Sequence, residues 1–307
     1  MRYWPVGLAL WLLLLAGVEL ALLVAVWEYF VRSAHGQLLD TVALSANSIG
    51  RTRVESLVED ILNAMSVVSL GIATAAVGFI ALIRRRIALA VGAVLLIGGA
   101  NATALLLKSG LHRPELGIDV QRAGAGNSFP SGHTTIAASV AVALVLVLPP
   151  GVRGVAAVLG ALFTSVAGVA TLSAGWHRPS DAIGSLLLVG VWASAAGLFI
   201  VAAQHSHGGV EYGPPHRRTL LILGVAGLAL LGGAWIGLGL TDHSLPSRAD
   251  EVGRHRLMVA YAGAALGITG IATLLCASVL ATVHRVVPRV VAPPPTRRKP
   301  AKAAAGS

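Results

Sequence analysis

Long apolar stretches alternate with short polar segments along most of the chain. We distinguish eight such stretches, at residues 5–31, 62–83, 87–107, 134–150, 154–173, 182–203, 219–240 and 257–282. Most are close to the roughly 20 apolar residues that a helix needs to cross the hydrocarbon core of a bilayer. Open strands would leave backbone polar groups unpaired in lipid, so helices are expected. The pattern therefore predicts an all-α fold, a polytopic membrane helix bundle.

The composition supports lipid as the solvent of this chain. Of its 307 residues, 55% are hydrophobic and 12% are charged, whereas soluble domains carry about 25% charged residues. The net charge of +10 is concentrated in the C-terminal tail and in short loops, which indicates topology-setting charge rather than a nucleic-acid site. The single cysteine, Cys276, excludes an intramolecular disulfide and a cysteine-based zinc site.

The loops and small residues predict how the helices are arranged. The Arg84–Arg86 cluster lies in a very short loop, which favours cytoplasmic N- and C-termini in a multi-pass plasma (cell) membrane protein. Clusters such as Gly98-Gly99-Ala100 allow close helix approach. The polar segment 33–60 has apolar residues at helical spacing, so we expect a short amphipathic helix on the bilayer surface. The residues from Pro288 onward are expected to be a disordered basic tail.

Three polar patches interrupt the apolar pattern, and all three fall on the same, extracytoplasmic side when the spans are counted. Lys108 ends the third span, Pro130-Ser131-Gly132-His133 opens the fourth, and His177–Asp181 joins the fifth to the sixth. Lys108 is the only lysine before the C-terminal tail. Lysine at a helix end commonly reaches for the interface, but beside Arg113 and Arg122 it also fits an anion site.

The second and third patches contain the residue types of a phosphoryl-transfer site. Ser131 can cap a helix and Gly132 allows close approach of a ligand, so the amides there would face an anion at a helix N-terminus. His133 could then act as an acid. His177 and Asp181 are four residues apart, which lets the carboxylate orient the ring of a nucleophile or base. A plain helix start is the structural alternative for the tetrapeptide. The spacing does not fit a zinc site.

Lys108, Pro130–His133 and His177–Asp181 follow one another in this order and fall on the same side of the membrane. In both respects they resemble the motifs of the type 2 phosphatidic acid phosphatase (PAP2) superfamily. The resemblance covers roughly residues 60–205 and implies a six-helix PAP2-like core with two extra C-terminal transmembrane helices. It implies His177 as nucleophile, Asp181 as its orienting partner and His133 as the acid for the leaving group. Ser131, Gly132 and Lys108 would bind phosphoryl oxygens, and neither a metal nor another cofactor is needed.

The sequence departs from the family pattern at two arginines. The family's first motif has Arg-Pro seven residues after its lysine, where this chain has Glu115-Leu116, with Arg113-Pro114 two residues earlier. The third motif has Ser-Arg where this chain has Ala170-Thr171. Each lost donor to a phosphoryl oxygen would cost about 10²–10³ in rate. Arg113, Arg122 and Arg178 are the candidates to compensate.

The leading hypothesis is a metal-independent membrane phosphatase that hydrolyses a lipid phosphate or diphosphate ester through a phosphohistidine. Phosphatidic acid, phosphatidylglycerol phosphate and polyprenyl (di)phosphates are the substrate candidates. A lipid phosphotransferase and a catalytically weak lipid-phosphate binding or transport protein are the alternatives. The only expected partner is the lipid from the bilayer, with no nucleic acid, and a homo-oligomer is compatible with this hypothesis. We divide the chain into an N-terminal helix with its polar segment (1–60), a catalytic core (61–205), two further spans (206–285) and the tail (286–307).

Overall fold

The chain folds into a bundle of long helices. The computed structural model describes residues 6–49, 56, 58–60, 62–63, 67–83, 86–119, 124, 126–204, 216–243, 245 and 251–286. The helices are α1 (Val6–Val26), its π-helical continuation η1 (Trp27–Val31), α2 (Ala34–Ser45), the 3₁₀ turn η2 (Ala46–Ser48), α4 (Val67–Ile83), α5 (Ile87–Gly110), α6 (Gly132–Val147), α7 (Arg153–Ser173), α8 (Pro179–Gln204), α9 (Arg217–Asp242) and α10 (Arg254–Val286). Every predicted apolar stretch therefore corresponds to one helix, and the predicted fold is confirmed.

The helices suit a bilayer in length and in surface. Six helices of the described chain are long and apolar enough to cross a membrane, and Leu70–Ile83 and Gly132–Val147 are shorter apolar helices. Large apolar side chains are exposed along α1, α5, α7 and α9, for example Leu13, Leu106, Leu162 and Trp235. Since such surfaces are unfavourable in water, lipid must cover them.

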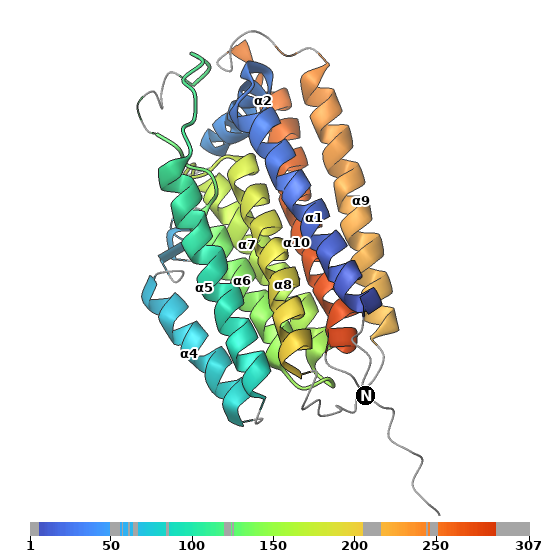
Figure 1. Ribbon diagram of the computed structural model, residues 1–307. Coiled ribbons are helices and arrows are strands. Elements are labelled where there is room, and N and C mark those ends of the chain that lie inside the picture. The colour runs from blue at the N-terminus through green and yellow to red at the C-terminus, as the bar shows by residue number, and fades with distance from the viewer. Residues whose placement is uncertain are drawn as a thin grey trace, which may run out of the picture.

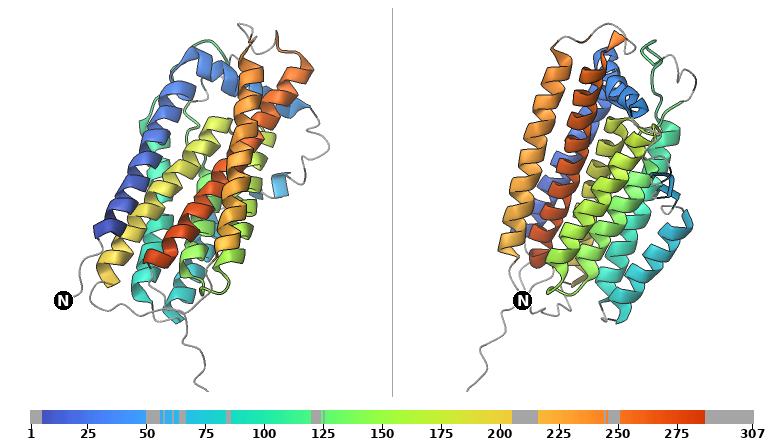
Figure 2. Two further views of the ribbon diagram at one scale, coloured as in Figure 1. Left: turned by 90° about the vertical axis from the view of Figure 1, so that its right-hand side faces the viewer. Right: turned by 180° about the vertical axis from the view of Figure 1, so that it is seen from behind.

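The bundle has a defined order from one edge to the other. In Figures 1 and 2, α9 and α10 lie at one edge, α4 and α5 lie at the opposite edge, and α6, α7 and α8 lie between them. The helix α2 lies at the end of the bundle where α5 ends and where α6 and α8 begin (Figure 1). We call this the α2 end.

Glycines allow the helices to pack closely, as predicted. A Cβ at Gly99 of α5 would lie 2.4 Å from the Trp192 ring of α8, whereas a Cβ at the adjacent Gly98 would meet no atom within 4 Å. The Trp192 indole also donates a hydrogen bond to Thr103 of α5 (3.1 Å). A Cβ at Gly237 of α9 would lie 2.8 Å from the Gly263 Cα of α10. These glycines set how closely the neighbouring backbones approach.

The prediction for residues 33–60 is wrong where the structure describes a helix. Residues 36–44 of α2 are all buried, and α2 packs against α8 and α10 instead of lying on the bilayer surface. Its apolar side chains Leu38 and Val42 join a small core with Val252 and Ala260. An amphipathic pattern indicates an apolar face but does not say whether lipid or protein covers it. Much of 50–60 and the predicted tail beyond Val286 lie outside the described residues.

Candidate active site

The three polar patches meet at the α2 end of the bundle. The backbone N–H of Ser131 donates to the carbonyl of Asp181 (3.0 Å), which ties the start of α6 to the first turn of α8. The Ser185 hydroxyl lies within hydrogen-bond distance of the carbonyls of both Ser131 (2.7 Å) and Asp181 (2.9 Å). The shared side that span counting predicted is confirmed.

The turn that presents His177 follows from the way α7 ends. Gly175 has a φ of 72°, a conformation that glycine adopts readily and that commonly terminates helices. The N–H groups of Trp176 and His177 donate to the carbonyl of Thr171 (3.0 and 3.2 Å). Thr171, which stands where the family has arginine, is fully buried, and its hydroxyl donates to the Gly168 carbonyl. Its role in this structure is to form the turn.

His177 and Asp181 form the oriented pair that their spacing predicted. The His177 Nδ1 atom lies 3.3 Å from the Asp181 carboxylate, and both residues are buried. The same carboxylate oxygen accepts from the backbone N–H of Arg178 (3.0 Å) and the hydroxyl of Ser128 (2.7 Å). Asp181 is thus fixed by several donors, and it leaves Nε2 as the ring nitrogen available for chemistry.

His133 lies across from this pair at the first turn of α6. Its ring centroid is 5.4 Å from that of Trp176, the residue that precedes His177. Both His177 and Lys108 are within electrostatic range of His133. Lys108 itself lies exposed in the last turn of α5. His177 and Lys108 therefore both lie near enough to His133 to interact with it electrostatically.

Of the two residues predicted to hold phosphoryl oxygens here, only Gly132 faces open space. Ser131 is completely buried, its N–H is used by Asp181, and its hydroxyl accepts from the Thr134 amide as the cap of α6. A Cβ at Gly132 would meet no atom within 4 Å. The first amides of a helix have no acceptor within it, so the Gly132 and His133 amides can bind an anion while Ser131 holds the helix start.

The candidate arginines are engaged inside the protein. Arg113 is 8% exposed and its guanidinium lies 3.6 Å from the carboxylates of both Asp40 and Asp181. Its two terminal nitrogens have no hydrogen-bond acceptor among the described residues. Arg178 forms an ion pair with Asp119 (2.7 Å). Arg122 lies outside the described residues.

Sequence reasoning missed several residues that shape this site. Asn127 donates to the carbonyl of Phe129 (2.9 Å) and accepts from its N–H (3.0 Å), which fixes the approach to Pro130. Ser128 and Asp119 hold Asp181 and Arg178, as described above. The position of Asn127 and Ser128 two or three residues before Pro130 was a visible signal, whereas Asp40 had no local signal because its partners are far away in the sequence.

The family comparison agrees with this geometry. Residues 88–205, which run from α5 to α8, match the model of the PAP2 superfamily, so this segment of the chain is similar to that superfamily. Its members are generally phosphatases, and the family indicates phosphoesterase activity on lipid-type phosphates. Comparisons with curated proteins and with solved structures give no match. The helices α1, α2, α4, α9 and α10 lie outside the matched segment.

Proposed function

We propose that this protein is a metal-independent phosphatase that hydrolyses a lipid phosphate or diphosphate ester through a phosphohistidine. One observation carries the proposal. His177, oriented by a buried carboxylate, and His133, at the first turn of a helix, stand at one hydrogen-bonded junction of a membrane bundle. A nucleophile that is oriented by a hydrogen-bonded carboxylate, with a proton donor beside it, suits covalent catalysis.

In the first step, the lone pair of His177 Nε2 attacks phosphorus and the P–O bond to the lipid breaks. His133 gives its proton to the leaving oxygen, and Asp181 accepts a hydrogen bond from Nδ1–H and stabilises the ring as it becomes positively charged. In the second step, water attacks phosphorus, the P–N bond breaks, and His133 takes the proton of the water. Lys108 and the amides of Gly132 and His133 would stabilise the charge on the phosphoryl oxygens.

An apolar groove beside the site supports a lipid substrate. It has a volume of about 540 Å³ and lies between α1, α5 and α8, with Leu107 and Phe129 among its lining residues. Leu107 directly precedes Lys108, and Phe129 directly precedes Pro130. A hydrocarbon chain in this groove would therefore lie next to the groups proposed to bind the phosphate. Phosphatidic acid, phosphatidylglycerol phosphate and polyprenyl (di)phosphates all have such a chain.

The arginine cluster at Arg84–Arg86 supports an orientation in which the α2 end, and with it the site, faces away from the cytoplasm. Substrates would then reach the site from the outer leaflet, and the phosphate would be released outside the cytoplasm.

The test is phosphate release from a panel of lipid phosphates in detergent micelles. We expect His177→Ala to abolish release and to prevent labelling of the protein by a ³²P-labelled substrate. His133→Ala should slow release by roughly 10²–10⁴-fold, the usual contribution of a general acid, while labelled phosphohistidine accumulates if its hydrolysis becomes the slower step. Addition of EDTA should leave the rate unchanged. Unchanged release by His177→Ala would refute the assignment.

A further inference from the structure

The helix α2 reaches the site although it lies outside the family-matched segment. The amide of Gln37 donates to the carbonyl of Pro114 (2.9 Å) and to that of Val31 (2.7 Å). One turn later, Asp40 lies 2% exposed within the bundle. Gln37 thus holds the backbone next to Arg113, and Asp40 faces the Arg113 side chain.

Within the described part of the chain, the carboxylate of Asp40 makes three polar contacts, all with elements of the site. One oxygen accepts from the backbone N–H of Ser180 (3.1 Å), and the other accepts from the Ser180 hydroxyl. The second oxygen also lies 3.6 Å from the Arg113 guanidinium. Ser180 immediately precedes Asp181, so Asp40 holds the first turn of α8 at the position where that turn presents its catalytic carboxylate.

Arg113 lies between the carboxylates of Asp40 and Asp181 and interacts electrostatically with both. Its guanidinium lies at the same 3.6 Å separation from Asp40 and from Asp181. The nearby Arg178–Asp119 ion pair is neutral in sum, so Arg113 between two buried carboxylates leaves a net negative charge, which a protonated His177 ring is placed to balance. If Asp40 were neutral, the charge of Arg113 would act on Asp181 alone, and Asp181 would stabilise the His177 cation less.

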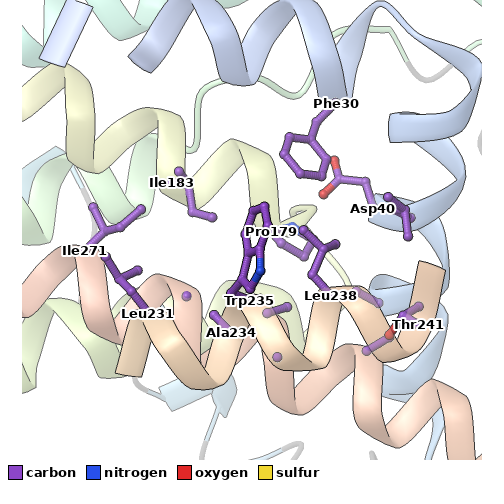
Figure 3. A pocket seen from close by; sticks show the side chains of 16 residues that line it. Phe30, Asp40, Pro179, Ile183, Leu231, Ala234, Trp235, Leu238, Thr241 and Ile271 are labelled. Carbon is purple, nitrogen blue, oxygen red and sulfur yellow. The ribbon is translucent and has the colours of Figure 1, made fainter. Parts of the chain in front are cut away.

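The surroundings of Asp40 make these charges interact strongly. Asp40 and Pro179 line a pocket of about 330 Å³ whose other lining residues, apart from Thr241, are apolar, including Ile183, Leu238 and Ile271. Figure 3 shows the carboxylate of Asp40 at the edge of this pocket, near Pro179. Charges in apolar surroundings interact over longer distances than charges in water.

We propose that Asp40 is a positioning residue of the active site. It anchors the start of α8 through Ser180, and it offsets the positive charge of Arg113 so that Asp181 can orient the His177 ring and stabilise its protonated form. This inference rests on the proposed function for its kinetic consequences only. The active site then includes a residue from outside the family-matched segment.

The kinetic test compares Asp40→Asn with Asp242→Asn. Asp242 is the matched control because it also contacts α2, through an ion pair with His35 (2.6 Å), but lies half-exposed at the end of α9. We expect Asp40→Asn to lower kcat roughly tenfold or more through loss of alignment, with KM changed less than about threefold. We expect Asp242→Asn to retain wild-type kcat within about twofold, since surface ion pairs contribute little.

A second measurement does not depend on turnover. The titration of the His177 ring is followed by NMR of histidine-labelled protein, with the signal assigned by its loss in His177→Ala. Asp40→Asn should lower the titration midpoint by about one pH unit, the size expected from losing one buried charge nearby. Asp40→Glu keeps the charge but displaces Ser180, so it should restore the midpoint and still lower kcat.

These results separate the two proposals. If the wild-type protein releases no phosphate from any lipid, the proposed function fails, while the His177 titration still decides the role of Asp40. A folded Asp40→Asn protein with wild-type kcat and a wild-type midpoint overturns the inference, as does an equal kcat loss in Asp242→Asn. If the Asp40 variants do not fold, Ser180→Ala decides: an unchanged kcat in this variant overturns the inference.

Discussion

At the scale of single residues, the site is a network of buried charged side chains that neutralise and hold one another. Asp181 accepts hydrogen bonds from Ser128 and from the backbone of Arg178, and it faces His177 and Arg113. Among the residues that the structure describes, the partners of Asp40 are Ser180 and Arg113. Burial raises the pKa of Asp40 to about 6, with the charge of Asp181 as a further cause, although Arg113 and Ser180 act in the opposite direction.

The raised pKa of Asp40 predicts how stability depends on pH. Below about pH 4 the carboxyl is protonated in both the folded and the unfolded chain. Between about pH 4 and pH 6 the unfolded chain loses this proton and the folded chain keeps it, so the unfolding free energy falls as the pH rises. The total change is about 3 kcal/mol, and it levels off above pH 6.

The measurement is thermal unfolding in detergent of the wild-type protein and Asp40→Asn at several pH values. The wild type should lose stability relative to the variant as the pH rises from 4 to 6, because the variant lacks this titration. A wild type that gains stability relative to the variant over that range would contradict the raised pKa.

The residues of the site could be predicted from the sequence where their partners are close along the chain. His177 and Asp181 are one helical turn apart, and the tetrapeptide Pro130–His133 contains its own helix cap. Asp40 and Ser180 are 140 residues apart, and Arg178 and Asp119 are 59 residues apart. Such pairs depend on how the helices pack, which no local pattern in a single sequence encodes.

At the scale of helices, apolar length predicted the elements well because the bilayer sets it. The helix α2 was predicted from the spacing of its apolar residues, but its predicted place on the bilayer surface was wrong, because it is buried and carries polar groups such as Gln37 and Asp40. The sequence alone does not distinguish a polar residue on the buried face of an amphipathic helix from one on its solvent-exposed face. The close packing predicted for Gly98-Gly99 was correct for Gly99, which meets Trp192, while Gly98 faces open space.

The contact between α9 and α10 gives a prediction with a control in the same helix. A Cβ at Gly237 would lie 2.8 Å from the Gly263 Cα, whereas one at Gly239 would meet no atom within 4 Å. Gly237→Ala should therefore push the two backbones apart and destabilise the protein by about 1–3 kcal/mol, the usual cost of overpacking. Gly239→Ala should be neutral or slightly stabilising.

Unfolding midpoints of the two glycine variants in the same detergent provide the comparison. Equal midpoints for Gly237→Ala and Gly239→Ala would show that the α9–α10 contact is looser than the structure has it.

At the scale of the whole molecule, the proposed orientation predicts which end of the bundle is accessible from outside the cell. Ser109 and Gly151 lie at opposite ends and are both exposed, while the native Cys276 is buried. In intact cells a membrane-impermeant maleimide should label Ser109→Cys but not Gly151→Cys. Labelling of Gly151→Cys should require permeabilised cells. The reverse pattern would place the site on the cytoplasmic side.

The junction at Ser185 has a consequence for how a lipid can enter. Its hydroxyl bridges the carbonyls at the starts of α6 and α8, and the Ser131 amide joins the same two places. These hydrogen bonds tie together the first turns of α6 and α8, which carry His133 and Asp181, the partner of His177. If the bundle opens sideways to admit a bulky headgroup, an opening between α6 and α8 would separate the proposed acid, His133, from the proposed nucleophile, His177. A lateral opening that leaves the site intact has to form between other helices of the bundle.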